Sequence, residues 1–388
     1  MFDFKGLRVL VLDGYGKQVA AILTELHKYG VEITTLNYSK LDIGYSSRYP
    51  DRRLLEPRAK TDKDYLAQVI DREIRSGCYD VVFPMLEAAT DIVLRNEKEY
   101  GKYIHIAAAP YDSFILAYDK QNTMRISQEI GIPCPLTRMD GEDLDEFLDR
   151  VEYPIAIKPR KGSGSIGFKR INEKARLMEL IEDGTVVPDE YVIQECVQGF
   201  KNKFVTNLFF DEKGEVKSSI TLQMNRWYPI DSGPNCMLWT VDRPDITDYS
   251  TRLLKAMNWR GFGQVCYMED PRDLTPKILE INGRIPASIK INQICGIPIV
   301  GQILSLAMGR PVPDFGANKK FGVRVRQAQA DLLWFLESPD RWTTKPSWFD
   351  RRNTQDTIFS IKDPLPFFTF AAEHLLSYRS DMKKRDRH

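Results

Sequence analysis

A continuous apolar run near the start of the chain constrains the fold more than any other feature. The run LRVLVLD covers residues 7–13 and ends in a Gly-Tyr-Gly turn. Because its apolar residues do not alternate with polar ones, it predicts a strand buried on both faces, as in parallel sheets that helices cover. A helical pattern over 17–29 and strand patterns at 31–37 and 79–85 follow. We therefore predict a βαβ start and a small doubly wound domain.

The Gly-Tyr-Gly turn permits a second interpretation, a dinucleotide-binding fingerprint. That fingerprint needs a third small residue, and the chain has Val19 at this position. We therefore favour a tight strand-to-helix turn over a nicotinamide or flavin site.

Composition and charge narrow the classes of function. The chain has 388 residues, which suits two or three modules, and its net charge of +1 offers no footprint for nucleic acid. The first residues do not have the pattern of a signal peptide, and no apolar run reaches membrane-spanning length. The six cysteines form no CxxC or Cys/His cluster. We therefore expect buried, reduced thiols in a cytoplasmic protein that has no transmembrane segment and binds no nucleic acid.

The middle of the chain changes from helix-flanked strands to antiparallel hairpins. Helical patterns cover residues 120–130 and 245–259, and strand patterns cover 153–159, 191–197, 204–211, 261–270 and 277–282. Lys213-Gly214 predicts a hairpin turn. From about residue 321 onward aromatic residues become frequent. The order of patterns predicts an α/β module followed by α+β modules.

Four segments carry the residues that we expect to do chemistry. In chain order they are Asp119-Lys120 with Thr123, then Lys158-Pro159 with the glycine loop at 162–167, then Gln194 to Val197, and last Leu279 to Asn282 with Arg284.

These segments contain the parts of a phosphoryl-transfer site. A Gly/Ser loop can turn its backbone N–H groups toward phosphate oxygens, and a lysine at the preceding strand end supplies charge. Glu280 and Asn282 lie two apart on a strand, so both face one side and suit Mg²⁺. Arg284 follows on that side and can meet a transferring phosphoryl group. Taken singly, each part has an ordinary alternative, such as a surface turn, a solvated lysine, or an ion pair of Glu280 with Arg284 or Lys277.

Taken in this order, the four segments resemble the ATP-grasp superfamily, and most of all its carbamoyl-phosphate-synthase-like and amino-acid-ligase branches. The resemblance covers residues 1 to about 310 and includes the stretch DVVFPMLEAATDIVLRN. It implies a Rossmann-like pre-ATP-grasp domain at 1–105 and a small lobe with a glycine-rich lid at 106–190. It also implies a large lobe at 191–320, and residues 321–388 are then a C-terminal extension.

The resemblance also implies roles for individual residues, with ATP as the nucleotide and Mg²⁺ as the metal, or Mn²⁺ in its place. Lys120 and Lys158 resemble the two nucleotide lysines. Leu279 resembles the apolar residue against adenine, and Arg284 resembles the phosphate-binding arginine. The lid over the phosphates includes Gly162, Ser163, Gly164 and Gly167. The hinge whose backbone meets adenine is Gln194, Glu195, Cys196 and Val197. Glu280 and Asn282 resemble the metal ligands.

Three positions depart from the family pattern. Asn202 stands where a glutamate usually meets the ribose hydroxyls, and an amide can still accept one hydrogen bond. Cys266 stands where an oxygen ligand usually holds the first metal, and a buried thiol suits Mg²⁺ poorly. Gln264, Glu269 or a water can take its place. Gly283 replaces a proline.

The family's usual reaction transfers the γ-phosphoryl group to a carboxylate, after which an amine displaces phosphate. We therefore predict a ligase with Lys158 and Arg284 as catalytic groups and small carboxylates and amines as substrates. Carbamoyl phosphate synthesis is not expected, because the second arginine of that pattern is Ala287 here. A biotin carboxylase role has no positive support in the sequence. The main alternative is an ATP-binding regulator of the same fold that has lost turnover.

The acceptor half of the site is less clearly marked. Arg226, Arg324 and Arg326 can hold substrate carboxylates, or they can form surface salt bridges. The aromatic run PLPFFTFAAEHLLSYR with the basic end that follows allows a membrane-surface or partner contact, or a helix that covers the core. A homodimer is left open.

Overall fold

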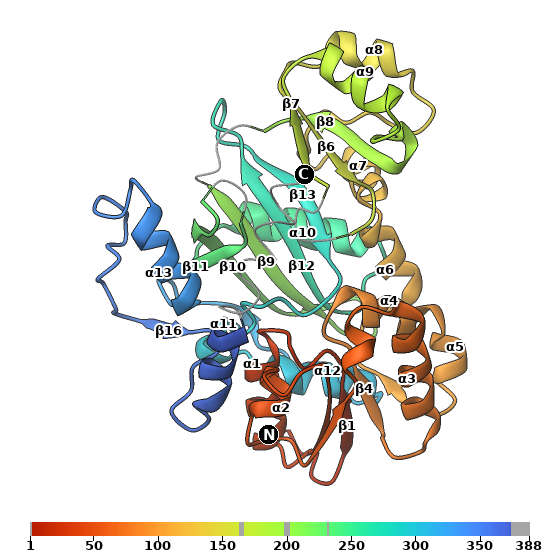
Figure 1. Ribbon diagram of the computed structural model, residues 1–388, viewed down its shortest axis with the longest axis vertical. Helices are drawn as coiled ribbons and strands as arrows, with labels where there is room; N and C mark the ends of the chain where they lie inside the picture. The colour runs from red at the N-terminus through yellow and green to blue at the C-terminus, as the bar shows by residue number, and fades with distance from the viewer. Residues whose placement is uncertain (1, 163–166, 198–201, 231–232, 374–388) are drawn as a thin grey trace.

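The computed structural model describes residues 2–162, 167–197, 202–230 and 233–373. Figure 1 shows a first domain around the N-terminus, a small lobe at the opposite end and a large lobe between them. The described strands form a five-stranded, an eight-stranded and a three-stranded sheet. The predicted fold class, α/β followed by α+β, is confirmed.

The first domain is built on the predicted parallel sheet. Its strand order is β3-β2-β1-β4-β5, and every neighbouring pair is parallel. The apolar run supplies the central strand, in which Val9, Leu10 and Val11 are fully buried. The strands are β1 (Arg8–Val11), β2 (Glu32–Asn37), β3 (Arg52–Leu55), β4 (Val81–Phe83) and β5 (His105–Ile106). The helices are α1 (Val19–Lys28), α2 (Ile43–Ser46), η1 (Pro57–Lys60), α3 (Lys63–Arg75), α4 (Glu87–Arg95) and α5 (Glu97–Tyr100).

The turn after β1 needs a glycine because two strands approach closely there. A Cβ on Gly14 would lie 2.1 Å from Asn37 Oδ1 and 3.0 Å from the Leu36 carbonyl oxygen. The Gly14 N–H donates to that carbonyl at 2.8 Å. Packing against β2 therefore accounts for Gly14, which supports the interpretation as a strand-to-helix turn.

The small lobe is an antiparallel sheet of order β7-β6-β8 with two helices packed on it. The chain enters through α6 and α7, and the side chain of Asp119 caps α7 by accepting from the Gln121 N–H at 3.0 Å. The elements are α6 (Tyr111–Tyr118), α7 (Lys120–Glu129), α8 (Leu144–Arg150), β6 (Ile155–Pro159), β7 (Lys169–Ile171), α9 (Lys174–Glu182), η2 (Pro188–Glu190) and β8 (Tyr191–Glu195).

The large lobe is an eight-stranded sheet with helices on both faces. Its order is β13-β12-β9-β10-β11-β15-β16, with β14 paired to β10. Helix α10 packs on one face, and α11 packs on the other beside Val205 and Cys266. The strands are β9 (Lys203–Phe210), β10 (Val216–Trp227), β11 (Asn235–Val241), β12 (Gly261–Glu269), β13 (Pro276–Asn282), β14 (Gly316–Ala317), β15 (Arg324–Arg326) and β16 (Thr354–Asp356). The helices are α10 (Pro244–Ala256), α11 (Lys290–Cys295), α12 (Ile299–Ala307) and α13 (Ala328–Glu337).

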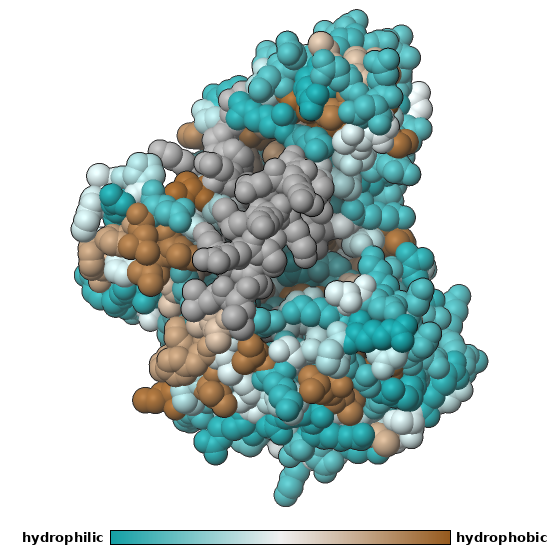
Figure 2. Space-filling model, viewed as in Figure 1, coloured by the Kyte–Doolittle hydropathy of each residue, from teal (hydrophilic) through white to brown (hydrophobic). Residues whose placement is uncertain are grey.

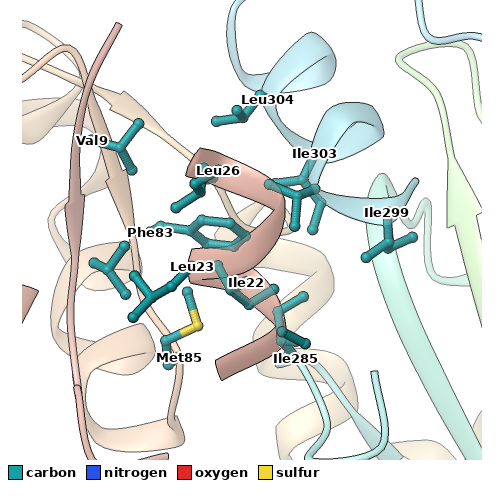
Figure 3. Close-up of a cluster of buried hydrophobic side chains, with 14 of the residues drawn as sticks. Val9, Ile22, Leu23, Leu26, Phe83, Met85, Ile285, Ile299, Ile303 and Leu304 are labelled. Atoms are coloured by element: carbon teal, nitrogen blue, oxygen red, sulfur yellow. The ribbon is translucent and has the colours of Figure 1, made fainter. Parts of the chain in front are cut away.

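One hydrophobic cluster joins the first domain to the large lobe. Figure 3 shows side chains of α1 and β4 packed against side chains of α12 and of the loop after β13. The labelled residues include Ile22, Leu23, Leu26, Phe83, Ile285, Ile299 and Ile303. Because this core is shared, the chain segment that carries Arg284 is held against the first domain.

Residues beyond 320 complete the large lobe and return to the first domain. β15 pairs with β11 and β16 pairs with β15, so the large-lobe sheet continues past the predicted start of the C-terminal extension. A helix over residues 365–373 follows. Ser47 Oγ donates to Asp363 at 2.5 Å, and Lys60 pairs with Glu373 at 2.9 Å. These contacts bind the extension to the first domain.

The surface is mostly hydrophilic on the face drawn in Figure 2, with hydrophobic side chains at its left edge near α13. Leu332, Leu336, Trp342 and Phe349 are exposed. Among the described residues, no helix is both long enough and apolar enough to cross a membrane.

The six cysteines are free thiols. Cys236, Cys266 and Cys295 are buried, as expected. The expectation of burial is wrong for Cys78, which is exposed, because it lies in the loop between α3 and β4.

Candidate active site

The predicted segments meet where the small lobe faces the end of β13. A small cavity there is lined by Glu87, Lys120, Gly162, Glu280 and Asn282, among others. These residues come from the start of α4, the start of α7, the loop after β6, and β13. The structure therefore brings three of the four predicted segments together and adds a residue from the first domain.

Both predicted nucleotide lysines point into the junction of the lobes. Lys158 Nζ donates to the Leu279 carbonyl at 2.9 Å, and Lys120 Nζ donates to the Gly162 carbonyl at 2.7 Å. Burial lowers the pKa of Lys158 to about 8, an effect that Glu280 opposes and Lys120 reinforces. Burial also lowers the pKa of Lys120. A nearby anion stabilises the charged form of such partly desolvated ammonium groups. The pair of lysines is therefore suited to binding phosphate.

Oxygen-bearing side chains form a row across β13, β12 and β9. Asn282 Nδ2 donates to Gln264 Oε1 at 3.1 Å, and Gln264 Nε2 donates to Asn207 Oδ1 at 2.8 Å. Glu280 lies on the same face, opposite Cys266. Since the amide nitrogen of Asn282 is used within the row, its Oδ1 is directed toward other partners. A carboxylate and an amide oxygen side by side fit Mg²⁺, which draws its other ligands from water and phosphate.

Cys266, Gln264 and Glu269 differ in their surroundings and hence in their suitability as a metal ligand. Burial raises the pKa of the Cys266 thiol well above its ordinary value, so the group is a neutral thiol. Its Sγ accepts from Asn282 Nδ2 at 3.3 Å. Glu269 is paired with Arg243 at 2.8 Å and accepts from Asn202 Nδ2 at 2.9 Å. Gln264 therefore lies beside the predicted metal ligand Asn282, whereas Glu269 is bound by Arg243 and Asn202. The described residues contain no cluster of three or more His, Cys, Asp or Glu side chains suited to a metal.

The hinge is tied to both lobes. The Glu195 N–H donates to the Leu136 carbonyl at 2.7 Å, and the Cys196 N–H donates to the Pro154 carbonyl at 3.2 Å. Both N–H groups are therefore used in hydrogen bonds within the small lobe. The Glu195 carboxylate binds Lys277 of β13 at 2.5 Å, which links the hinge to the large lobe. The predicted contacts with adenosine remain predictions for all six residues concerned: Gln194, Glu195, Cys196, Val197, Asn202 and Leu279.

Of the predicted lid over 162–167, only the first and last residues belong to the described part of the chain. Gly162 and Gly167 have φ angles of 117° and 75°, which favour glycine. Ser163 and Gly164 lie outside the described residues.

Arg284 contacts the first domain. Its Nε donates to Glu87 Oε1 at 2.7 Å, and the two side chains form an ion pair. Gly283, which replaces the family's proline, lies so close to Phe114 that a Cβ would be 2.8 Å from the ring. The packing of α6 on β13 therefore accounts for this glycine.

A comparison with protein-family models identifies the family of this chain. The model of the carbamoyl-phosphate synthase L chain ATP-binding domain matches residues 119–315, about half of the chain. The chain belongs to this family. It is an ADP-forming ATP-grasp ligase of the carbamoyl-phosphate-synthase-like, carboxylate–amine ligase branch.

Solved structures share the ATP-grasp fold at low sequence identity. Biotin carboxylase from Campylobacter jejuni, solved as a β-γ-ATP complex, is 16% identical with a TM-score of 0.65, covering 79% of this chain and 72% of that one. L-amino acid ligase from Bacillus licheniformis is 17% identical with a TM-score of 0.61, covering 78% and 74%. The biotin carboxylase domain of 2-oxoglutarate carboxylase from Hydrogenobacter thermophilus, solved with MgADP and bicarbonate, is 15% identical with a TM-score of 0.65, covering 82% and 74%.

Sequence reasoning missed two residues of this ATP-grasp site. Glu87 reaches it from the first domain, and Lys203 at the start of β9 shares the face that carries Cys266. Burial lowers the pKa of Lys203, with Cys266 and Glu280 opposing the shift. The sequence signal for Lys203 is its position: it follows the hinge at the start of a strand pattern, in which alternate side chains share one face.

The three arginines predicted for substrate carboxylates form ion pairs within the ligase. Arg226 pairs with Asp331 at 2.6 Å, and these side chains are only 3% and 0% exposed. Arg326 also approaches Asp331, and Arg324 pairs with Asp350 at 2.9 Å. The salt-bridge alternative therefore describes their contacts, although the pair at Arg226 is buried and not at the surface. A role toward substrate remains a prediction for all three.

Proposed function

We propose that this ATP-grasp ligase phosphorylates a small carboxylate with ATP and then joins the acyl phosphate to an amine, releasing ADP and phosphate. One observation carries the proposal: Lys120, Lys158, Glu280 and Asn282 converge beside Arg284 at the junction of the lobes. No protein nucleophile lies among them. The group is suited to holding phosphates and neutralising charge, which is most of the catalysis that phosphoryl transfer needs.

Each side chain has a task that its geometry supports. Lys158 and Lys120 are partly desolvated cations that can hold the nucleotide phosphates. Arg284 can bind the acceptor carboxylate or the phosphoryl group, with Glu87 fixing its orientation. Glu280 and Asn282, with Gln264 beside them, would hold Mg²⁺. Bound Mg²⁺ would supply Lewis-acid neutralisation of phosphate charge.

The proposed reaction has two steps, phosphorylation of the acid and attack by the amine. A carboxylate oxygen attacks the γ-phosphorus of ATP and ADP leaves, which gives an acyl phosphate. The amine nitrogen then attacks the acyl carbon, loses a proton, and expels phosphate that keeps one oxygen of the original carboxylate. Exclusion of water until the amine arrives is what prevents simple hydrolysis.

An ADP-release screen tests the proposal. Carboxylates are assayed with Mg-ATP, each alone and with a panel of amino acids and other small amines. We expect ADP release that requires one acid and one amine, and that disappears in Lys158→Ala. Lys161→Ala is a suitable control, because Lys161 is exposed and lies three residues after Lys158, just before the glycine loop. ATP binding without ADP release in any mixture would favour the regulatory alternative instead.

A further inference from the structure

A second cavity lies between the first domain and the large lobe. Its volume is about 300 Å³. The chain from Ile106 to Pro110 forms one part of its wall, and residues of α12 and of the start of β12 form another part. Gly283 borders both this cavity and the candidate active site, and Arg284 contributes to its lining.

The walls of this cavity are mostly apolar. Three consecutive alanines, Ala107 to Ala109, line the space together with Phe262, Ile285 and Ile303. Small side chains on one wall leave room that larger ones would fill. A volume of about 300 Å³ and an apolar lining at a domain interface are typical of small-molecule sites.

Arg260 is one of three charged residues that line this cavity, together with Glu212 and Arg284. Its Nε donates to the Glu212 carbonyl at 2.7 Å, and its Nη1 donates to the Trp259 carbonyl at 2.8 Å. These bonds fix the half-buried guanidinium, yet within the described part of the chain no carboxylate lies at ion-pair distance from it. Arg284, by contrast, has Glu87 as its partner.

We propose that this cavity binds a small apolar monocarboxylic acid, with the carboxylate at Arg260 and the apolar body against the alanine wall. Glu212, which also lines the cavity, disfavours a second negative charge on the ligand. The ligand's carboxylate is held at Arg260, a residue to which the proposed ligase reaction gives no role, and not at Arg284, which is paired with Glu87.

Binding of 3-phenylpropanoate to the full chain, measured by calorimetry with a saturating non-hydrolysable ATP analogue present, tests the proposal. We expect one site whose affinity falls at least tenfold in Arg260→Gln and in Ala108→Phe, which fills the cavity. The neutral amide of the same compound should bind at least tenfold more weakly than the acid. Arg310→Gln is the matched control, since Arg310 also donates to a backbone carbonyl, that of Asp3, but does not line the cavity.

The outcomes separate cleanly once each variant is shown to keep the thermal midpoint and ATP-analogue affinity of the parent. Loss of acid binding in Arg260→Gln and Ala108→Phe, with Arg310→Gln unaffected, supports the site. Equal binding in Arg260→Gln, or no binding to the parent protein, overturns it. These measurements do not depend on ADP release, so they stand apart from the test of the ligase reaction.

Discussion

The pKa of Lys158 makes nucleotide affinity depend on pH in a direction that can be tested. Only the ammonium form attracts phosphate, and burial has lowered the pKa of this group in the free protein to about 8. Bound nucleotide favours the charged form and raises that pKa again. Affinity for Mg-ATP should therefore be greatest well below pH 8 and fall as the pH rises through 8. Nucleotide binding near pH 8 should be accompanied by proton uptake.

The size of the effect follows from the protonated fraction of Lys158. With a pKa of about 8, about three quarters of the side chains are charged at pH 7.5 and about one tenth at pH 9. The dissociation constant of a non-hydrolysable ATP analogue should thus rise about eightfold between these two values. Lys120, whose pKa burial also lowers, adds to this loss.

Calorimetry at constant ionic strength measures this directly. The analogue is titrated at pH 7.5 and pH 9 into the parent protein and into Lys158→Arg, whose guanidinium stays charged at both values. The loss of affinity should be clearly smaller in the variant. Equal affinity of the parent at both pH values, or an undiminished loss in Lys158→Arg, would refute the reasoning.

Three further predictions concern the carboxylates. Glu280→Ala should abolish ADP release with cognate substrates yet leave the urea midpoint unchanged, because it removes the Mg²⁺ carboxylate; retained turnover would reject that role. Glu87→Gln should lower kcat about 10- to 100-fold with a smaller change in KM for ATP, since Arg284 loses its orienting partner, and Glu87→Asp should restore part of the rate. Asp331→Asn should lower the free energy of unfolding by about 3–5 kcal/mol, because Arg226 is left buried and unpaired; urea denaturation showing a loss below about 1 kcal/mol would contradict this.

Local patterns in the sequence were enough to predict the parts of the site that lie on regular elements. Alternation along β13 placed Glu280 and Asn282 on one face, and the pairing of β12 with β13 confirms it. The helical pattern over 120–130 placed Lys120 at the start of a helix, and α7 begins there with Asp119 as its cap. Such features depend on neighbours a few residues away, which the sequence shows directly.

Contacts between distant segments could not be predicted in this way. Glu87 and Arg284 are 197 positions apart, and Arg226 and Asp331 are 105 apart. Whether an arginine faces substrate or a buried carboxylate depends on how the modules pack, and no periodicity in the sequence encodes that packing. For the same reason, local patterns do not show that β15 and β16, after residue 320, continue the large-lobe sheet.

Transfer of a carboxylate oxygen to phosphate is the most direct test of the proposed reaction. Once a productive acid and amine are known, the acid is labelled with ¹⁸O in its carboxylate, and the released phosphate is examined by mass spectrometry. The acyl-phosphate route predicts one labelled oxygen in each phosphate, because the bond between carbon and the phosphorylated oxygen breaks in the second step. Unlabelled phosphate from a reaction that has formed the amide product would contradict the account.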